Sequence, residues 1–264
     1  MIELSTPFAD AARAGRRIGH RVEAHARLGS TNDRARDLLD DDDLEGVAVL
    51  AEEQITGRGR RGRTWSSPPG RNLTFSVAVR PRLAAADGWQ LGLGVALACR
   101  EACLPVADIG LKWPNDLVAA DGRKLAGLLV ETAIEGGRLA TAIIGIGLNV
   151  NWRHAEMPAE LAASATSLAE LTGREVDRVA MLGRLLEALD AEVAAIEAGR
   201  SPLDRYRRAC VTLGRVVVVE SGAGPVEGRA VDLDATGSLV VEGGAGRIVL
   251  ASGEVVHVRP VEDA

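Results

Sequence analysis

The sequence predicts an α+β fold: a larger domain of helices and strands over residues 1–210, followed by a small β-barrel over residues 211–264. Stretches of helical periodicity and apolar, strand-like stretches both occur before residue 210. Five short strand-like runs separated by Gly, Ala and Asp turns follow, which is typical of a small barrel. A chain of 264 residues is also long enough for one large and one small domain.

The first part of the larger domain predicts one helix and two strands. Residues 1–27 are polar and have short helical character, and a helix begins at Ser30, a residue type favoured at helix N-caps. The runs VAVLAEEQ (47–54) and NLTFSVAVR (72–80) predict two strands. The arginine-rich stretch between these strands is therefore a connection that is anchored at both ends.

The rest of the larger domain predicts two helices and three further strands. WQLGLGVALACREAC (89–103) has helical periodicity, and a long amphipathic helix over 179–199 is capped by Asp177 and ended by Gly199. The three strands are expected at LKWPNDLV (111–118), KLAGLLVETAIE (124–135) and ATAIIGIGLNV (140–150). After residue 211, five strands are expected at RVVVVE, EGRAVDLD, GSLVVE, GRIVLA and EVVHV.

Composition and charge disfavour several classes of protein. The net charge of −6 argues against a general nucleic-acid binder, because attraction to phosphates needs positive potential. No apolar run approaches the roughly 18 residues of a membrane span, and the N-terminus lacks the pattern of a secretory signal. Cys99, Cys103 and Cys210 form no CxxC pair and the histidines are scattered, which argues against a zinc site or a disulfide framework. We therefore expect a cytoplasmic globular protein that does not engage a membrane.

The stretch GRGRRGRTW, residues 57–65, places four arginines between glycines. Glycine allows backbone conformations closed to other residues and lets main-chain N–H groups approach a ligand. Guanidinium groups are planar, permanently charged donors that match phosphate or carboxylate oxygens. A disordered RGG-like segment is the alternative, but the flanking strands and the acidic remainder of the chain disfavour it. The stretch predicts a loop that closes over a polyanion and becomes ordered when the anion is present.

The stretch KWPND, residues 112–116, combines a fixed backbone with polar side chains. Pro114 restricts the turn, so Asn115 and Asp116 project from a defined position. A ligand contact and a plain turn are both compatible with Asn115. For Trp113, packing in the core is the expected role.

Three other stretches also have two possible roles. Lys124 opens a nearly apolar run, so it either extends into solvent or neutralises a bound carboxylate, and Gly127 behind it indicates a close approach to the backbone. GIGLNVN (145–151) is either a kinked strand end or a place where Asn149 contacts a ligand across a cleared backbone. STN (30–32) caps a helix, and its free N–H groups and hydroxyls can also form the floor of a polar pocket.

These stretches occur in the order GSTN, EEQITGRGRRGRTW, KWPNDL, GRKLAGLLVE and GIGLNVN. From about residue 28 to residue 151 they closely resemble the catalytic core of the biotin protein ligases. The resemblance implies a mixed-sheet catalytic domain related to class II aminoacyl-tRNA synthetases and a C-terminal SH3-like β-barrel. It also implies that the protein uses ATP and Mg²⁺ to activate biotin as biotinoyl-5'-AMP. The biotinyl group is then transferred to a lysine of the biotin carboxyl carrier domain of an acyl-CoA carboxylase.

By position, the resemblance implies three sets of site residues. The catalytic charges are Arg58, Arg60 and Lys124. The residues expected to contact biotin are Ser30, Thr31, Asn32, Gln54, Arg58, Gly59, Arg60, Lys124, Gly127, Gly145 and Gly147. Those expected to contact ATP are Arg60, Arg61, Arg63, Trp65, Asn115 and Asn149. The motif includes Asp116 without a defined role, and no protein ligand of Mg²⁺ is assigned.

Two other functions stay open from the sequence. A lipoate or octanoate protein ligase has the same fold group and a similar half-reaction, although its pattern lacks the GRGRRGR loop. A non-enzymatic nucleic-acid-binding module would use the arginine loop alone. Longer, repressor-type biotin protein ligases carry a winged helix-turn-helix before GSTN, and only 29 residues precede Ser30 here, so we expect no DNA binding.

Overall fold

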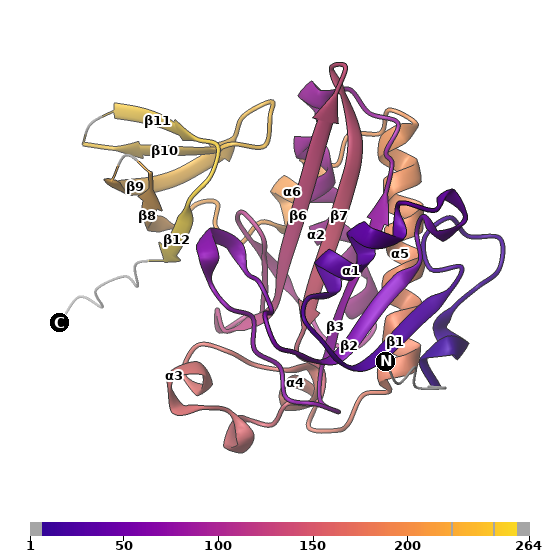
Figure 1. Cartoon of the computed structure of the whole chain (residues 1–264). Helices are drawn as coiled ribbons and strands as arrows, with labels where there is room; N and C mark the ends of the chain where they lie inside the picture. Colours follow the sequence, from indigo (N-terminus) through magenta and orange to yellow (C-terminus); the bar gives the residue numbers. More distant parts are fainter. Residues whose placement is uncertain (1–6, 223, 245, 258–264) are drawn as a thin grey trace.

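A computed structural model describes residues 7–222, 224–244 and 246–257, and it contains two β-sheets (Figure 1). The larger sheet has the strand order β1-β2-β3-β7-β6-β5-β4. Its strands are β1 (Val22–Leu28), β2 (Ala48–Gln54), β3 (Leu73–Val79), β4 (Gly110–Lys112), β5 (Asp116–Val118), β6 (Lys124–Glu135) and β7 (Arg138–Leu148). β1 and β2 are parallel and the other pairs are antiparallel, so the predicted mixed sheet is confirmed.

Helices cover both faces of this sheet, because its central strands are buried on both sides. Along β2, Ala48 and Leu50 face the main core, whereas Val49 belongs to a smaller cluster under α1 (Thr31–Leu38). The other face is covered by α2 (Trp89–Cys103) and α5 (Arg178–Glu197), which lie behind the sheet in Figure 1. The remaining helices are α3 (Ala159–Ala162), α4 (Leu168–Thr172) and α6 (Leu203–Ala209). None of the helices in the described part of the chain combines the length and apolar character needed to cross a bilayer.

The smaller sheet forms the C-terminal β domain that the turn-rich pattern predicts. Its five antiparallel strands run in the order β11-β10-β9-β8-β12. They are β8 (Val216–Ser221), β9 (Gly224–Leu233), β10 (Leu239–Gly243), β11 (Gly246–Leu250) and β12 (Glu254–His257). Figure 1 shows this sheet beside the larger one, with β12 turned towards the arginine-rich loop. The boundary between residues 210 and 211 stays a prediction.

The long helix and the KWPND turn illustrate how local chemistry fixes the elements. The Asp177 carboxylate accepts hydrogen bonds from the N–H groups of Val179 and Ala180, and Gly199 follows the helix with a φ of 83°. This matches the predicted cap and stop. Trp113 is buried, as expected, and its indole N–H donates to the carbonyl of Gly237 in the C-terminal domain at 3.1 Å.

Two expectations from the sequence are wrong in detail, and a third is confirmed in position but not in its contact. The N-terminal segment contains a strand, β1, as well as a short 3-10 helix, because its residues gain partners from β2 that local polarity does not reveal. Residues 111–118 are two short strands, since the turn at Pro114 reverses the chain and pairs β4 with β5. Ser30 lies at the N-cap of α1, but its side chain makes no capping hydrogen bond and instead lines a cavity.

Two glycines of α2 give a matched test of the packing between α2 and α5. A Cβ at Gly92 would meet no atom within 4 Å, whereas a Cβ at Gly94 would lie 2.5 Å from Cδ1 of Ile196 on α5. We expect Gly92→Ala to raise the free energy of unfolding by about 0.5–1 kcal/mol, since alanine is favoured over glycine within helices. Gly94→Ala should lower it by about 1–3 kcal/mol through overpacking. Urea denaturation measures both, and equal effects would contradict this packing.

Candidate functional site

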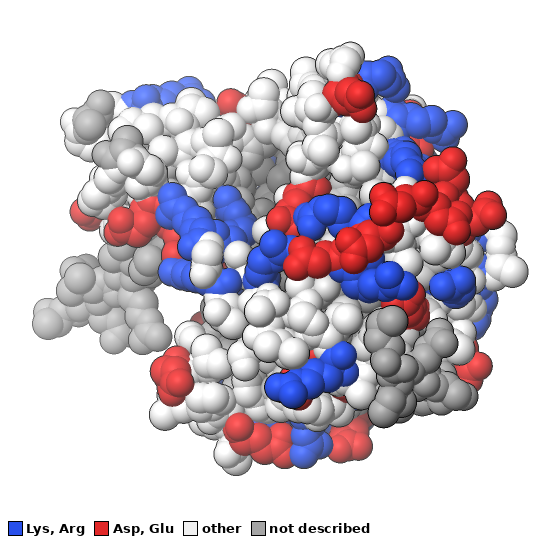
Figure 2. All heavy atoms as spheres, in the orientation of Figure 1, with Lys and Arg blue, Asp and Glu red and all other residues white. Residues whose placement is uncertain are grey.

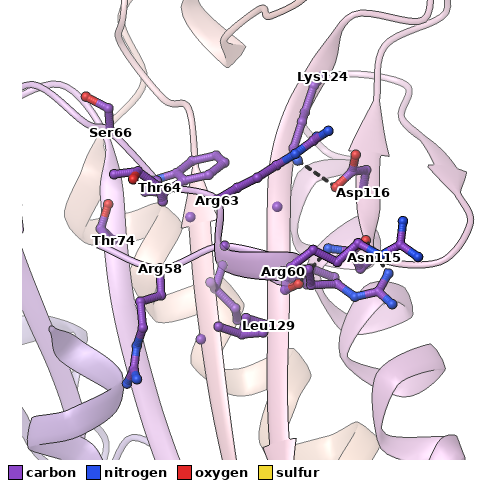
Figure 3. Close-up of a pocket in the computed structure, with 18 of the residues that line it drawn as sticks. Arg58, Arg60, Arg63, Thr64, Ser66, Thr74, Asn115, Asp116, Lys124 and Leu129 are labelled. Atoms are coloured by element: carbon purple, nitrogen blue, oxygen red, sulfur yellow. Dashed lines mark hydrogen bonds and ion pairs between the residues drawn. The ribbon is translucent and has the colours of Figure 1, made fainter. Parts of the chain in front are cut away.

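A cavity of about 370 Å³ opens between the larger sheet, the arginine-rich loop and β12. Its walls bring together every site residue predicted from the sequence, although these are spread from residue 30 to residue 149 of the chain. They are Ser30, Thr31, Asn32, Gln54, Arg58, Gly59, Arg60, Arg61, Arg63, Trp65, Asn115, Asp116, Lys124, Gly127, Gly145, Gly147 and Asn149. Figure 3 shows part of this set converging from the loop and from several strands.

The polar floor of the cavity is a connected hydrogen-bond network at the start of α1. The backbone N–H of Thr31 donates to Oε1 of Gln54 at 2.8 Å, and the Thr31 hydroxyl lies 3.0 Å from the same oxygen. Thr31 and Asn32 are both buried, and Ser76 on β3 contacts both of them. Because Oε1 of Gln54 already accepts hydrogen bonds from Thr31, the amide N–H groups of Gln54 are left as donors for a ligand.

Glycines on β6 and β7 give the neighbouring side chains room to lie flat on the sheet. A Cβ at Gly147 would lie 2.2 Å from the ring of Trp65, and one at Gly127 would lie 3.0 Å from the same ring. A Cβ at Gly145 would lie 2.4 Å from Oδ1 of Asn32. The three glycines are therefore needed for close approach, as their positions within strands indicate.

The arginine-rich loop is a small hairpin. Arg58 and Thr64 form a β-bridge, and the N–H of Gly59 donates to the carbonyl of Arg63 at 2.7 Å. Between them, a 3-10 turn spans Arg60–Gly62. At its centre, Arg61 has a φ of 57°, in the left-handed region that favours glycine. The tight turn separates the four arginine side chains, so that they extend in different directions.

Each arginine of the loop has its own partner. Arg60 donates to Oδ1 of Asn115 at 3.1 Å. Arg61 donates to the carbonyl of Glu220 at 2.7 Å, and Arg63 pairs with Glu254, so both contact the C-terminal sheet. Arg58 pairs with Asp33 on α1, and Figure 3 shows its guanidinium on the far side of the loop from Lys124. The loop thus bridges α1, the KWPND turn and the C-terminal domain.

Positive charge dominates the cavity wall. The lining includes six basic side chains (Arg58, Arg60, Arg61, Arg63, Lys112 and Lys124) and two acidic ones (Asp116 and Glu254). Figure 2 shows Lys and Arg gathered on the surface beside the C-terminal sheet, with Asp and Glu adjoining them. An excess of fixed cations in a partly enclosed space attracts anionic ligands.

The pKa shifts of two of these bases have the same origin. Burial, and then repulsion from Arg61, lowers the pKa of Arg60. Burial likewise lowers the pKa of Lys112, with repulsion from Lys124 adding to it and attraction from Asp116 opposing it. Both shifts mean that burial and mutual repulsion disfavour the charged forms of these two side chains. A bound anion would stabilise the charged forms.

Lys124 lies at the centre of the site. Its Nζ is 2.7 Å from Oδ1 of Asp116 and 5.7 Å from the centre of the Trp65 ring (Figure 3). The lysine is therefore turned towards the cavity by an ion pair and a cation–π contact, although 38% of its side chain stays exposed. Asp116, whose role the sequence leaves undefined, holds this lysine in place.

Sequence reasoning missed several residues of the site. Lys112 lies in the KWPND motif, so its charge was a usable signal. Ser76 and Thr74 lie on β3, where the strand pattern alone gives no sign of a cavity; the Thr74 hydroxyl is buried without a hydrogen-bond partner. Glu254 comes from β12 and reaches the site only through the docking of the C-terminal sheet.

The amide of Asn149 is already bonded to the protein. Its Nδ2 donates to the carbonyl of Thr166 at 3.0 Å, and its Oδ1 accepts from Asn72 at 3.3 Å. Asn149 therefore shapes the wall of the cavity, and its expected contact with ATP stays a prediction. Within residues 7–222, 224–244 and 246–257, no group of three or more His, Cys, Asp or Glu side chains is placed to hold a metal ion.

Comparison with known proteins agrees with this geometry. Residues 25–149 match the model of the biotin/lipoate A/B protein ligase family, and residues 212–258 match the biotin protein ligase C-terminal domain. Over 247 residues the chain is 36% identical to the biotin–[acetyl-CoA-carboxylase] ligase of Mycobacterium tuberculosis, covering 90% of this chain and 89% of the relative. The chain belongs to the biotin protein ligase family.

Two further members of the biotin protein ligase family are covered almost completely by this chain. The biotin–[acetyl-CoA-carboxylase] ligase of Paracoccus denitrificans is 34% identical over 238 residues, which are 87% of this chain and 98% of the relative. The biotin protein ligase of Aquifex aeolicus, solved in complex with biotin and ATP, superposes with a TM-score of 0.76 at 30% identity. That match covers 90% of this chain and 98% of the Aquifex chain.

Gly147→Ala tests the seating of Trp65. The added methyl group would overlap the indole ring, so the ring must move from its half-buried position on the sheet. We expect the tryptophan emission maximum to shift to longer wavelength and the free energy of unfolding to fall by about 1–3 kcal/mol. The shift should be absent when Gly147→Ala is made in a Trp65→Phe background. A shift that persists there would come from another tryptophan and would contradict the assignment.

Proposed function

We propose that the protein is an ATP-dependent ligase that activates biotin as biotinoyl-5'-AMP and transfers the biotinyl group to a lysine of a biotin carboxyl carrier domain. Membership of the biotin protein ligase family supports the reaction class. The observation that carries the proposal is the cavity itself, whose lining contains six basic residues and two acidic ones beside a neutral, hydrogen-bonding floor. Such a site suits a ligand with a polar neutral end and an anionic end.

The first step requires two anions to meet. The carboxylate of biotin attacks the α-phosphorus of ATP, so a C–O–P bond forms and pyrophosphate leaves. Fixed cations lower the repulsion between the reacting groups, and they act more strongly where water is excluded. Lys124 and Arg60 lie on this part of the wall, and Asp116 and Asn115 hold them there. We assign both cations to the developing charge at the reacting centre.

The two ends of the cavity suit different parts of the reactants. Ser30, Thr31, Asn32 and Gln54 form the uncharged floor, which we assign to the ureido ring of biotin. Trp65, Asn115 and Asn149 also line the cavity, and we assign them to the nucleotide, with Arg61 and Arg63 near its phosphates. Arg58 and Gly59 belong to the loop segment over the biotin and the acyl-phosphate.

Mg²⁺ fits this site as a companion of ATP. The two carboxylates of the wall are already paired, Asp116 with Lys124 and Glu254 with Arg63, so the described residues offer no set of oxygen ligands here. Mg²⁺ commonly binds through phosphate oxygens and water with few protein ligands. Bound to the triphosphate, it would neutralise part of the charge on ATP. We assign no protein residue as its ligand.

In the second step the neutral amine of the carrier lysine attacks the acyl carbonyl of biotinoyl-AMP. A C–N bond forms, the bond from the carbonyl carbon to the phosphate oxygen breaks, and AMP leaves as the anion while the amine loses its proton. No protein nucleophile is required. The mixed anhydride is sensitive to water, and the loop over residues 57–65 covers this part of the cavity. We propose that the loop becomes ordered over the anhydride and shields it until the lysine arrives.

Biotin is favoured over lipoate or octanoate as the acyl substrate. The matching family model includes ligases for both classes of substrate, but the C-terminal match is specific to biotin protein ligases. Free, buried thiols at Cys99, Cys103 and Cys210, together with the use of ATP, favour a cytoplasmic location.

The proposal predicts a mass increase on one carrier lysine. We expect this protein, incubated with biotin, Mg-ATP and a biotin carboxyl carrier domain, to add one biotinyl group to the domain. Mass spectrometry measures the increase, and a carrier with arginine in place of that lysine is the control. Modification by lipoate in place of biotin, or no modification at all, would contradict the proposal.

Lys124→Gln separates the role of this lysine from its packing. The substitution leaves a slightly shorter side chain that can still donate a hydrogen bond, but it removes the charge that faces the reacting carboxylate. We expect biotin-dependent exchange of pyrophosphate into ATP to fall by at least about a hundredfold, the scale seen when one stabilising donor is lost from an active site. Arg123→Gln, which lies next to it outside the cavity wall, is the control. Near-parental exchange by Lys124→Gln would show that another cation serves this step.

A further inference from the structure

We propose that Glu131, on β6 at the end of the GRKLAGLLVE motif, sets the direction of the hydrogen bonds in the cavity floor and thereby its preference for a ligand with N–H donors. The inference rests on the proposed function, because the ligand in question is the ureido ring of biotin. Glu131 is not part of the cavity wall described above. It lies behind Asn32, where it accepts a hydrogen bond from Nδ2 of that residue at 2.8 Å.

The position of Asn32 makes this contact decisive. The amide lies over Gly145 on β7, because a Cβ there would come within 2.4 Å of its oxygen. Gly145 pairs with Ser76 on β3, and β6 is the neighbour of β7 on the other side. The amide of Asn32 therefore spans β7 from Ser76 to Glu131. One end of the amide must be an N–H donor and the other must be a carbonyl acceptor.

Glu131 decides which end faces which neighbour. An ionised carboxylate accepts hydrogen bonds and donates none. Arg36 forms an ion pair with the same carboxylate at 3.1 Å, and Arg58 lies 4.0 Å from it. Asn32 must therefore turn its NH₂ group towards Glu131, which leaves its Oδ1 towards the hydroxyl of Ser76 at 2.6 Å. Ser76 then has to donate its single proton to Asn32.

As a result, the oxygen–oxygen contacts of the cavity floor outnumber the hydroxyl protons that could bridge them. Three oxygen–oxygen contacts link Asn32 to Ser76 (2.6 Å), Ser76 to Thr31 (2.7 Å) and Thr31 to Gln54 (3.0 Å). The two hydroxyl groups supply only two protons for these contacts. A floor with more acceptors than protons favours a ligand that brings N–H groups. The free amide N–H groups of Gln54 provide the complementary donors for a carbonyl, so the floor matches both parts of a ureido group.

If Asn32 were turned over, this preference would be lost. Its NH₂ group would then donate to Ser76, and Ser76 could donate to Thr31, so that every contact in the chain would have a proton. Fewer oxygen lone pairs would then be left to accept an N–H group of the ligand. Glu131 is thus a positioning residue, because it acts on the ligand through Asn32 and Ser76.

The test uses the full-length protein and biotin titrated calorimetrically in the absence of ATP. In Glu131→Gln, the new amide can turn either way, and Asn32 can turn with it. We expect the Kd for biotin to rise by about tenfold, which corresponds to about 1.4 kcal/mol. The Kd for ATP and the thermal midpoint should stay close to those of the parent. Glu135→Gln, at an exposed position on the same strand, is the matched control and should leave the Kd for biotin unchanged.

A double variant makes the test specific. In Asn32→Asp combined with Glu131→Gln, the amide introduced on β6 donates to the carboxylate introduced on α1, which again can only accept from Ser76. The direction of the chain is restored with the charge moved from one partner to the other, so the double variant should recover most of the affinity lost in Glu131→Gln. Asn32→Asp alone places two carboxylates face to face and should bind biotin more weakly than either.

Three results would overturn the inference. They are an unchanged Kd for biotin in Glu131→Gln, a double variant no better than the single one, and an equal loss of biotin and ATP binding with a lower thermal midpoint. The last result would mean that Glu131 only supports the fold. Failure of the parent protein to bind biotin would instead count against the proposed function, so the two failures are distinguishable.

Discussion

The close approach of two side chains to the glycines of β7 is the constraint on which the site depends. Trp65 lies against Gly147, and Asn32 lies against Gly145, at distances that leave no room for a Cβ. The two glycines are separated by one residue, so both face the same side of the sheet. The indole and the amide are therefore held next to each other, one from the arginine-rich loop and one from α1. The adenylate side and the biotin side of the proposed reaction meet along this single strand.

Electrostatics then divides the cavity into a charged wall and a neutral floor. On the wall, each cation near the proposed reacting centre is held by a neighbour from the KWPND turn, Lys124 by Asp116 and Arg60 by Asn115. A held cation needs little reorganisation when charge develops, which is the physical basis of electrostatic catalysis. On the floor, no charged group touches the hydroxyls of Thr31 and Ser76 among the described residues. The carboxylate of Glu131 acts on the floor indirectly, because it orients the amide of Asn32.

The C-terminal sheet is tied directly to the loop. Arg61 donates to a backbone carbonyl of β8, and Arg63 pairs with a carboxylate of β12. Trp113, within the KWPND turn, donates to the carbonyl of Gly237 between β9 and β10. The small domain therefore supports both the loop and the turn that hold the cations, and it supplies Glu254 to the cavity wall. This arrangement gives the second domain a physical part in the site.

The sequence by itself determined the elements whose signals are local. The cap and stop of α5, the periodicity of α2 and the five short C-terminal strands follow from residues close together in the chain. The ordered motifs also identified the residues that line the cavity. Tertiary structure decided what depends on distant partners. β1 is a strand because β2 lies beside it. Ser30 stands at the N-cap of α1 but lines a cavity without a capping side-chain bond, and Glu131 and Glu254 reach the site only through sheet order and domain docking. Periodicity encodes burial and local turns, but it carries no record of which strands become neighbours.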